Sequence, residues 1–114
     1  MKFKTTRKAI KENYSNIICI SYCHLQQLLS GKEPIAYTTR REGWAADIYE
    51  VNNNTVIVTG YAPFGNIHPD YELVKEYEKK ANIITSSSII NWEEKQERLN
   101  ILINEFVSRV EEEN

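Results

Sequence analysis

Three short β-rich runs around a row of asparagines constrain the fold of this 114-residue chain most strongly. Residues 35–40 are rich in β-formers, and residues 44–51 alternate between two sets of side chains, as a strand with two different faces does. Residues 52–54 are all Asn, which tolerates the positive φ of a tight turn, and residues 55–59 form the third run. The pattern predicts a three-stranded antiparallel meander.

Helical periodicity precedes this meander. Thr5 or Thr6 is a suitable N-cap for a short helix over residues 7–14. Apolar residues at spacings of three and four predict a second helix over residues 22–29, closed by Gly31 as a glycine cap. Residues 16–20 lie between the two and fit either a strand or a helix.

Two further helices are predicted after the meander. An apolar stripe follows Pro69, which suits the first position of a helix. Asn91 with Glu94 resembles a capping box before a last apolar stripe that runs to Val110. The predicted fold class is therefore α+β: a small antiparallel three-stranded meander with two N-terminal and two C-terminal helices, in one domain over residues 1–114.

Composition places the chain among ordinary globular proteins. Hydrophobic residues make up 41% and charged residues 26%, and a chain of this length has room for one core. The apolar runs fall short of the roughly 20 residues of a membrane span, and the basic start lacks the apolar stretch of a signal peptide. We therefore expect a soluble cytoplasmic protein without a membrane partner, in which Cys19 and Cys23 remain thiols.

The net charge of −2 is unevenly distributed. Residues 1–68 contain eight Lys/Arg and five Asp/Glu, whereas residues 69–114 contain six and eleven. Such an asymmetry can orient a domain towards a charged partner, although it also occurs in proteins that bind nothing charged.

Cys19, Cys23 and His24 form a cluster of metal-ligating residue types. A structural zinc site needs about four ligands, and the fourth would have to be His68 from a distant loop. We therefore interpret the cluster as thiols beside a partly exposed histidine, and expect neither metal nor cofactor.

The sequence offers no catalytic group with its partner. Cys23 and His24 are adjacent, and neighbouring side chains on a helix point about 100° apart. Asp47 and Glu50 fall on opposite faces of their strand, which prevents them from acting as an acid–base pair. A glycine-rich phosphate loop is also missing from the sequence. We therefore expect a protein that is not an enzyme.

Two segments combine aromatic and polar side chains. The turn over residues 40–44 joins two arginines to an indole, which is typical of protein-binding hot spots. Nucleic-acid binding is a second interpretation, which the pI of about 5.7 disfavours, and a plain surface turn with Trp44 in the core is a third. The loop over residues 61–68 flanks the same strand pair. The candidate partner-binding residues are Arg40, Arg41, Glu42, Trp44, Tyr61, Phe64, Asn66 and His68.

Four blocks of the sequence carry a resemblance to a family: residues 5–10, 22–29, 43–49 and 59–66. In order and spacing they are similar to a family of small uncharacterised proteins from plasmids, phages and conjugative elements of Gram-positive bacteria. The resemblance spans nearly the whole chain and brings no catalytic residues with it.

The resemblance implies an accessory protein of a mobile element. Such proteins often inhibit host defences by occupying a surface, which needs complementarity and no chemistry. The expected function is an anti-CRISPR inhibitor that binds a type II effector nuclease in the bacterial cytoplasm and blocks guide loading, DNA loading or activation. One alternative is a nucleic-acid-binding accessory or regulatory protein of the element's transfer or replication machinery. Another is a structural partner without inhibitory activity.

Overall fold

The computed structural model describes residues 2–39, 41, 45–60 and 67–113, which belong to two compact units. The first, here called the sheet unit, comprises Met1–Tyr22 and Pro34–His68. The second, the helical unit, comprises Cys23–Glu33 and Pro69–Asn114. Each unit is therefore assembled from two separate stretches of the chain.

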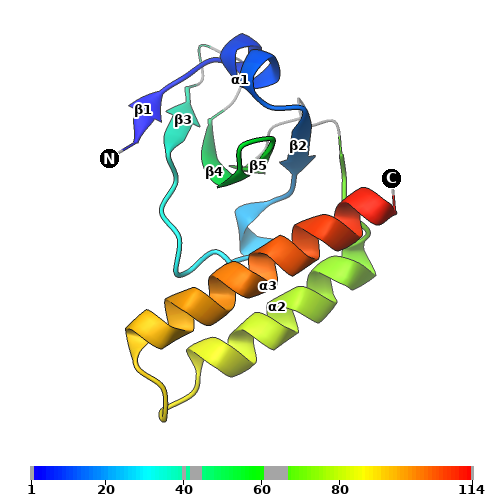
Figure 1. Cartoon of the computed structure of the whole chain (residues 1–114). Helices are drawn as coiled ribbons and strands as arrows, with labels where there is room; N and C mark the ends of the chain where they lie inside the picture. The colour runs from blue at the N-terminus through cyan, green and yellow to red at the C-terminus, as the bar shows by residue number, and fades with distance from the viewer. Residues whose placement is uncertain (1, 40, 42–44, 61–66, 114) are drawn as a thin grey trace. The chain divides into compact units, whose positions relative to one another are not determined.

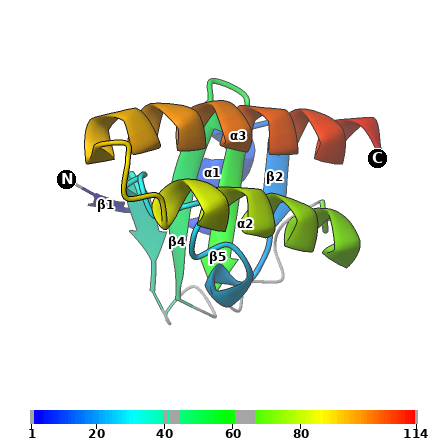
Figure 2. The same ribbon diagram turned by 90° about the horizontal axis from the view of Figure 1, so that it is seen from below.

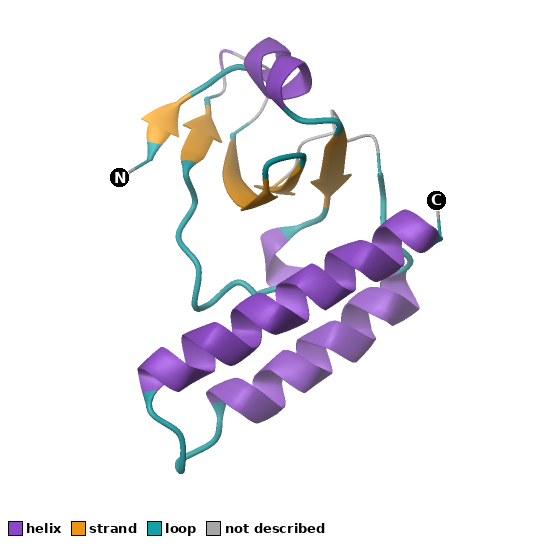
Figure 3. Ribbon diagram, viewed as in Figure 1, coloured by secondary structure: helices purple, strands orange, loops and turns teal. Residues whose placement is uncertain are grey.

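The sheet unit contains a five-stranded mixed sheet in the order β1-β3-β4-β5-β2 (Figures 1 and 3). The central strands β3, β4 and β5 are antiparallel, whereas β1 pairs with β3 and β2 pairs with β5 in parallel. The strands are β1 (Phe3–Lys4), β2 (Asn16–Cys19), β3 (Ala36–Thr38), β4 (Ala46–Asn52) and β5 (Thr55–Gly60).

The prediction of a three-stranded antiparallel meander with two helices on either side is wrong. The strands β3, β4 and β5 lie where the β-rich runs indicated, but two parallel edge strands are added to them. Residues 16–20, left open between strand and helix, contribute β2. Parallel strands are joined by long connections and not by tight turns, so these two strand pairs could not be predicted from a local turn pattern.

A single short helix connects the two edge strands. α1 (Arg7–Asn13) begins at Thr6, whose side chain accepts a hydrogen bond from the backbone N–H of Ala9. Its buried residue Ile10 packs into an apolar cluster on one face of the sheet. The other buried members of that cluster are Ile17, Cys19, Ala46, Ile48, Val56 and Val58. They occupy alternate strand positions, as side chains on one face must.

The helical unit contains two antiparallel helices, α2 (Tyr71–Thr85) and α3 (Trp92–Glu112), which lie side by side (Figures 1 and 2). The N-cap predicted at Asn91 is confirmed, because its side-chain oxygen accepts from the N–H of Glu94 at 2.9 Å. The carboxylate of Glu94 accepts from Arg98 at 3.1 Å, so the structure shows one of the two bonds of a capping box. The rings of Tyr77 and Phe106, both fully buried, lie 5.5 Å apart between the two helices.

The helix predicted over residues 22–29 is a 3₁₀ turn, η1 (Tyr22–His24), followed by successive turns. The backbone N–H groups of Gln27 and Leu28 bond to the carboxylate of Glu78 on α2, at 2.9–3.0 Å. In an α-helix these donors would bond to carbonyls four residues earlier. The predicted helix therefore does not form, although Leu25, Leu28 and Leu29 are buried as its spacing indicated.

Gly31 has a different role from the predicted cap. A Cβ atom at this position would lie 3.2 Å from side-chain carbons of Gln96 and Leu99 on α3, closer than ordinary van der Waals contact. Glycine therefore lets the segment approach α3 closely, whereas a larger residue would displace the side chains of Gln96 and Leu99 slightly.

In the part of the chain that the structure describes, no helix has the length and apolar character needed to cross a membrane.

Replacing Glu78 by Ala tests the capping role of its carboxylate, which is to accept hydrogen bonds from the N–H groups of Gln27 and Leu28. The change leaves the N–H groups of Gln27 and Leu28 without their acceptor, so we expect unfolding to become easier by about 1–3 kcal/mol. Chemical denaturation with circular dichroism gives the measurement. Glu76→Ala is the matched control, because this exposed carboxylate pairs only at the surface with Lys80 and Arg109. Equal effects of the two changes would contradict the capping role.

Candidate functional site

Two of the predicted partner-binding residues lie in the described part of the chain: Arg41 and His68 are both exposed. The other six lie outside the described residues: Arg40, Glu42, Trp44, Tyr61, Phe64 and Asn66. For these the structure gives the positions at which their segments leave the sheet.

Both segments leave from one end of the sheet. Ala46, the first residue of β4, pairs with Gly60, the last residue of β5, and also with Thr38 at the end of β3. The turn that carries Arg40 to Trp44 and the loop that begins at Tyr61 therefore start from directly opposed positions. Their sequence separation had left this arrangement open.

A pocket of about 370 Å³ lies at this end of the sheet. We call it the strand-end pocket; its lining residues are Lys2, Tyr22, Tyr37, Thr38, Ala45, Ala46, Asp47 and Thr59. The ammonium of Lys2 is 3.0 Å from the carboxylate of Asp47 and 5.5 Å from the centre of the Tyr37 ring. Aromatic rings with a cation are typical of protein-binding hot spots. Sequence reasoning missed Tyr22 because it is distant from the turn in sequence, and it missed Tyr37 because the sequence pattern assigns this residue only to the strand before the turn.

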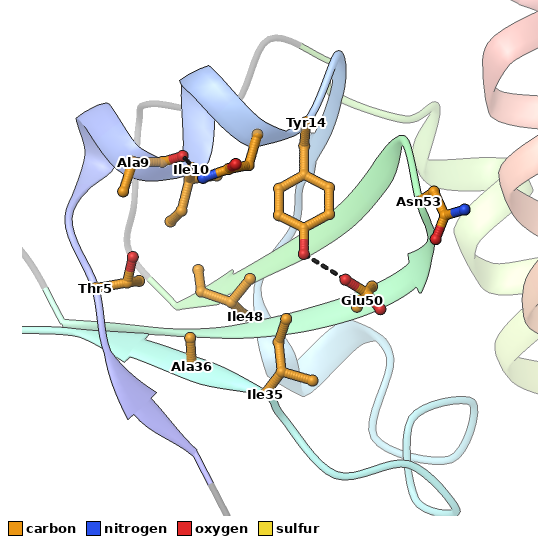
Figure 4. Close-up of a pocket in the computed structure, with 10 residues that line it drawn as sticks. Thr5, Ala9, Ile10, Tyr14, Ile35, Ala36, Ile48, Glu50 and Asn53 are labelled. Carbon is orange, nitrogen blue, oxygen red and sulfur yellow. Dashed lines mark hydrogen bonds between the residues drawn. The ribbon is translucent and has the colours of Figure 1, made fainter.

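A second pocket, of about 330 Å³, lies between α1 and the sheet (Figure 4). We call it the α1 pocket. The hydroxyl of Tyr14, just after α1, donates a hydrogen bond to the carboxylate of Glu50 on β4. Figure 4 shows the Tyr14 ring above Ile48, with its hydroxyl directed at Glu50. Burial, and then the hydrogen bond and negative charge of Glu50, raise the pKa of Tyr14 to about 12.

The two acidic residues of β4 belong to different pockets, Asp47 to the strand-end pocket and Glu50 to the α1 pocket. This separation follows from the alternation of side chains along a strand.

The cysteine and histidine cluster is not assembled into a metal site. Cys19 is buried in the apolar cluster of the sheet unit, whereas Cys23 and His24 are exposed. The His24 ring meets the Tyr71 ring edge-on, with 5.4 Å between centroids. Among the residues that the structure describes, no group of three or more His, Cys, Asp and Glu side chains is placed to hold a metal ion.

The charge asymmetry of the sequence coincides with the two structural units. The sheet unit has seven Lys/Arg and four Asp/Glu, a net charge of +3, and the helical unit has seven and twelve, a net charge of −5. Five of the positive residues of the sheet unit fall within residues 2–11. Partners of opposite charge would therefore be attracted to different units.

The protein is thus an α+β protein whose sheet unit contains the strand-end pocket and the α1 pocket. No protein-family model, curated protein or solved structure matches the chain.

The raised pKa of Tyr14 predicts a loss of stability at alkaline pH. The folded state favours the neutral phenol, so this contribution is complete below the ordinary pKa near 10 and is lost as the pH rises through about 12. We expect Tyr14→Phe to reduce the fall in unfolding free energy between about pH 10 and 12, measured by urea denaturation. Part of the fall should remain, because burial also raises the pKa of Tyr49 to about 12. An unchanged pH dependence would contradict the role of Tyr14.

Proposed function

We propose that this protein is encoded by a mobile element and inhibits a type II RNA-guided effector nuclease of the bacterial host. It would inhibit the nuclease by binding to it. The observation that carries the proposal is the pairing of Ala46 with Gly60. Because of this pairing, both candidate segments join the sheet at the same end. Both segments combine aromatic and polar residues in their sequences, and the described residues at this end of the sheet line the strand-end pocket, with the rings of Tyr22 and Tyr37 among them. A surface of this composition favours contact with a protein.

The charge distribution supports an inhibitor that occupies a surface. RNA-guided nucleases hold nucleic acid in a positively charged channel, and the helical unit carries a net charge of −5. Exposed carboxylates are spaced along α3, including Glu93, Glu97 and Glu105. Charge complementarity of this kind speeds association and selects the partner. The step we propose to be blocked is loading of guide or DNA, or the activation that follows, in the bacterial cytoplasm.

A specific observation favours a second candidate function, nucleic-acid binding in the element's transfer or replication. The first eleven residues contain five Lys/Arg and no acidic residue, and Phe3 among them is 65% exposed. Lysines that reach phosphates beside an aromatic ring that stacks on a base are typical of single-strand binding.

Charge reversals at two places in the sheet unit separate the functions. We call the candidate residues of segments 40–44 and 61–68, together with the lining of the strand-end pocket, the strand-end surface. If this surface binds a nuclease, Arg40→Glu with Arg41→Glu should abolish inhibition in a cleavage assay with a purified type II effector, its guide and target DNA. The expected loss is a few kcal/mol of binding free energy, provided that the charges are desolvated in the complex. The control, Lys8→Glu with Lys11→Glu, should still inhibit, and thermal melts should show both variants folded.

The second candidate function predicts the reverse. Lys8→Glu with Lys11→Glu would then abolish a salt-sensitive mobility shift of single-stranded DNA, and the arginine variant would retain it. Full inhibition by the folded arginine variant would remove the strand-end surface from the interface. No inhibition by the wild type would overturn the inhibitor proposal for the effectors tested.

A further inference from the structure

Among the residues that the structure describes, the α1 pocket is lined by an apolar wall and one charged group. Its apolar lining comes from both α1 and the sheet, and Figure 4 shows Ile35, Ala36 and Ile48 along one side. Of its lining residues, Glu50 is the one that carries a formal charge. Thr5, Asn13 and Asn53 add uncharged polar groups. The pocket therefore combines an apolar wall with a polar side that includes a carboxylate.

The carboxylate of Glu50 has unused capacity to accept hydrogen bonds. One oxygen accepts from Tyr14, and among the described residues neither a second hydrogen-bond donor nor a cation contacts Glu50. A carboxylate can accept about four hydrogen bonds. Asp47, three residues earlier on the same strand, is by contrast neutralised by Lys2 at 3.0 Å. Within the described part of the chain, the two carboxylates of this strand therefore differ: Asp47 has a cationic partner, whereas Glu50 has a neutral one.

The position of Glu50 in the strand also sets it apart. The pairing of β4 with β5 is regular up to Glu50 and changes register between Glu50 and Asn52. Such irregularities re-aim the side chains beside them and are frequent next to binding sites. Glu50, at which the change of register begins, and Asn53, the residue after its end, both line the pocket.

We propose that the α1 pocket binds a primary alkylammonium group. The ammonium would donate to the open oxygen of Glu50 and to the oxygen of Tyr14, while the alkyl chain lies against Ala36 and Ile48. An ammonium has three donors, and the side-chain oxygen of Asn53 offers an acceptor for the third. The ligand is either a lysine side chain of a partner protein or a free polyamine, because both present this group on an unbranched chain. The inference does not depend on the proposed function.

The expected affinity is modest. A volume of about 330 Å³ is at the small end of ligand sites. The sheet unit has a net charge of +3, which opposes a cation at long range. Short-range contact with Glu50 must outweigh this repulsion, so we expect a dissociation constant on the order of 1 mM for a simple alkylammonium.

A ligand pair tests the role of charge on the unaltered protein. In ¹H–¹⁵N correlation spectra, n-pentylammonium chloride should shift the backbone amides of Ala9, Glu50 and Asn53 in a saturable manner. 1-Pentanol has the same alkyl chain without the charge and should bind at least about tenfold more weakly. Equal binding of the two compounds, or no saturable shift with pentylammonium, would overturn the proposal.

Matched variants test the role of the carboxylate. Glu50→Gln keeps the shape and removes the charge, so it should weaken pentylammonium binding about tenfold or more. Asp47→Asn removes a carboxylate from the same strand on its other face and should bind like the wild type. The affinity of Tyr14→Phe for pentylammonium should lie between those of the Glu50 and Asp47 variants. Spectra without ligand show whether each variant is folded. Unchanged binding by folded Glu50→Gln, or equal losses in the Glu50 and Asp47 variants, would refute the site.

Two further probes identify the source of the ammonium. Nα-acetyl-lysine methylamide reproduces a lysine in a polypeptide, and spermidine reproduces a free polyamine. Tighter binding of the lysine amide would support the site as a receptor for a partner's lysine, and tighter binding of spermidine would support it as a polyamine site. Failure of both to shift the pocket amides would contradict an alkylammonium site.

Discussion

The packing of Ile10 against the sheet is the contact on which the sheet unit depends. β1 and β2 lie at opposite edges of the sheet, although only residues 5–15 separate them in sequence. The connection between them must therefore cross one face, and α1 makes the crossing. Ile10 is 3% exposed and lies in the apolar cluster with Ile48 and Val58. Without this contact a seven-residue helix would not be stable, because short helices depend on tertiary packing.

The same crossing creates the α1 pocket. A helix of two turns covers only part of the face beneath it, and Tyr14 at its end reaches towards Glu50 beyond the apolar cluster. The carboxylate thus lies where the apolar face gives way to polar side chains. On the other face, Lys2 from the N-terminal segment reaches Asp47. One segment of the chain therefore supplies a partner to each acidic residue of β4, a cation to one and a neutral hydroxyl to the other.

Features fixed by neighbouring residues were predictable from the sequence. The N-cap at Asn91 and the central strands follow from patterns within a few residues. Sequence reasoning failed where a distant group decides the structure. The carboxylate of Glu78, about 50 residues away in sequence, accepts hydrogen bonds from the N–H groups of Gln27 and Leu28. The segment with the helical pattern therefore forms turns. The contact of Tyr14 with Glu50 spans 36 positions and has no local signature.

The separation of charge between the units determines how each pocket can be reached. A partner rich in carboxylates or phosphates would be drawn to the sheet unit by its net charge of +3, and the Debye length of about 8 Å at physiological salt limits that attraction to close approach. The strand-end pocket already contains a neutralised pair, Lys2 with Asp47, so it offers such a partner little additional charge. The α1 pocket offers an anion within a cationic unit. Salt should therefore screen two opposing effects there, the attraction of an ammonium to Glu50 and its repulsion by the surrounding lysines. For this reason ammonium binding in the α1 pocket should change less with salt than the binding of a polyanion to the N-terminal lysines.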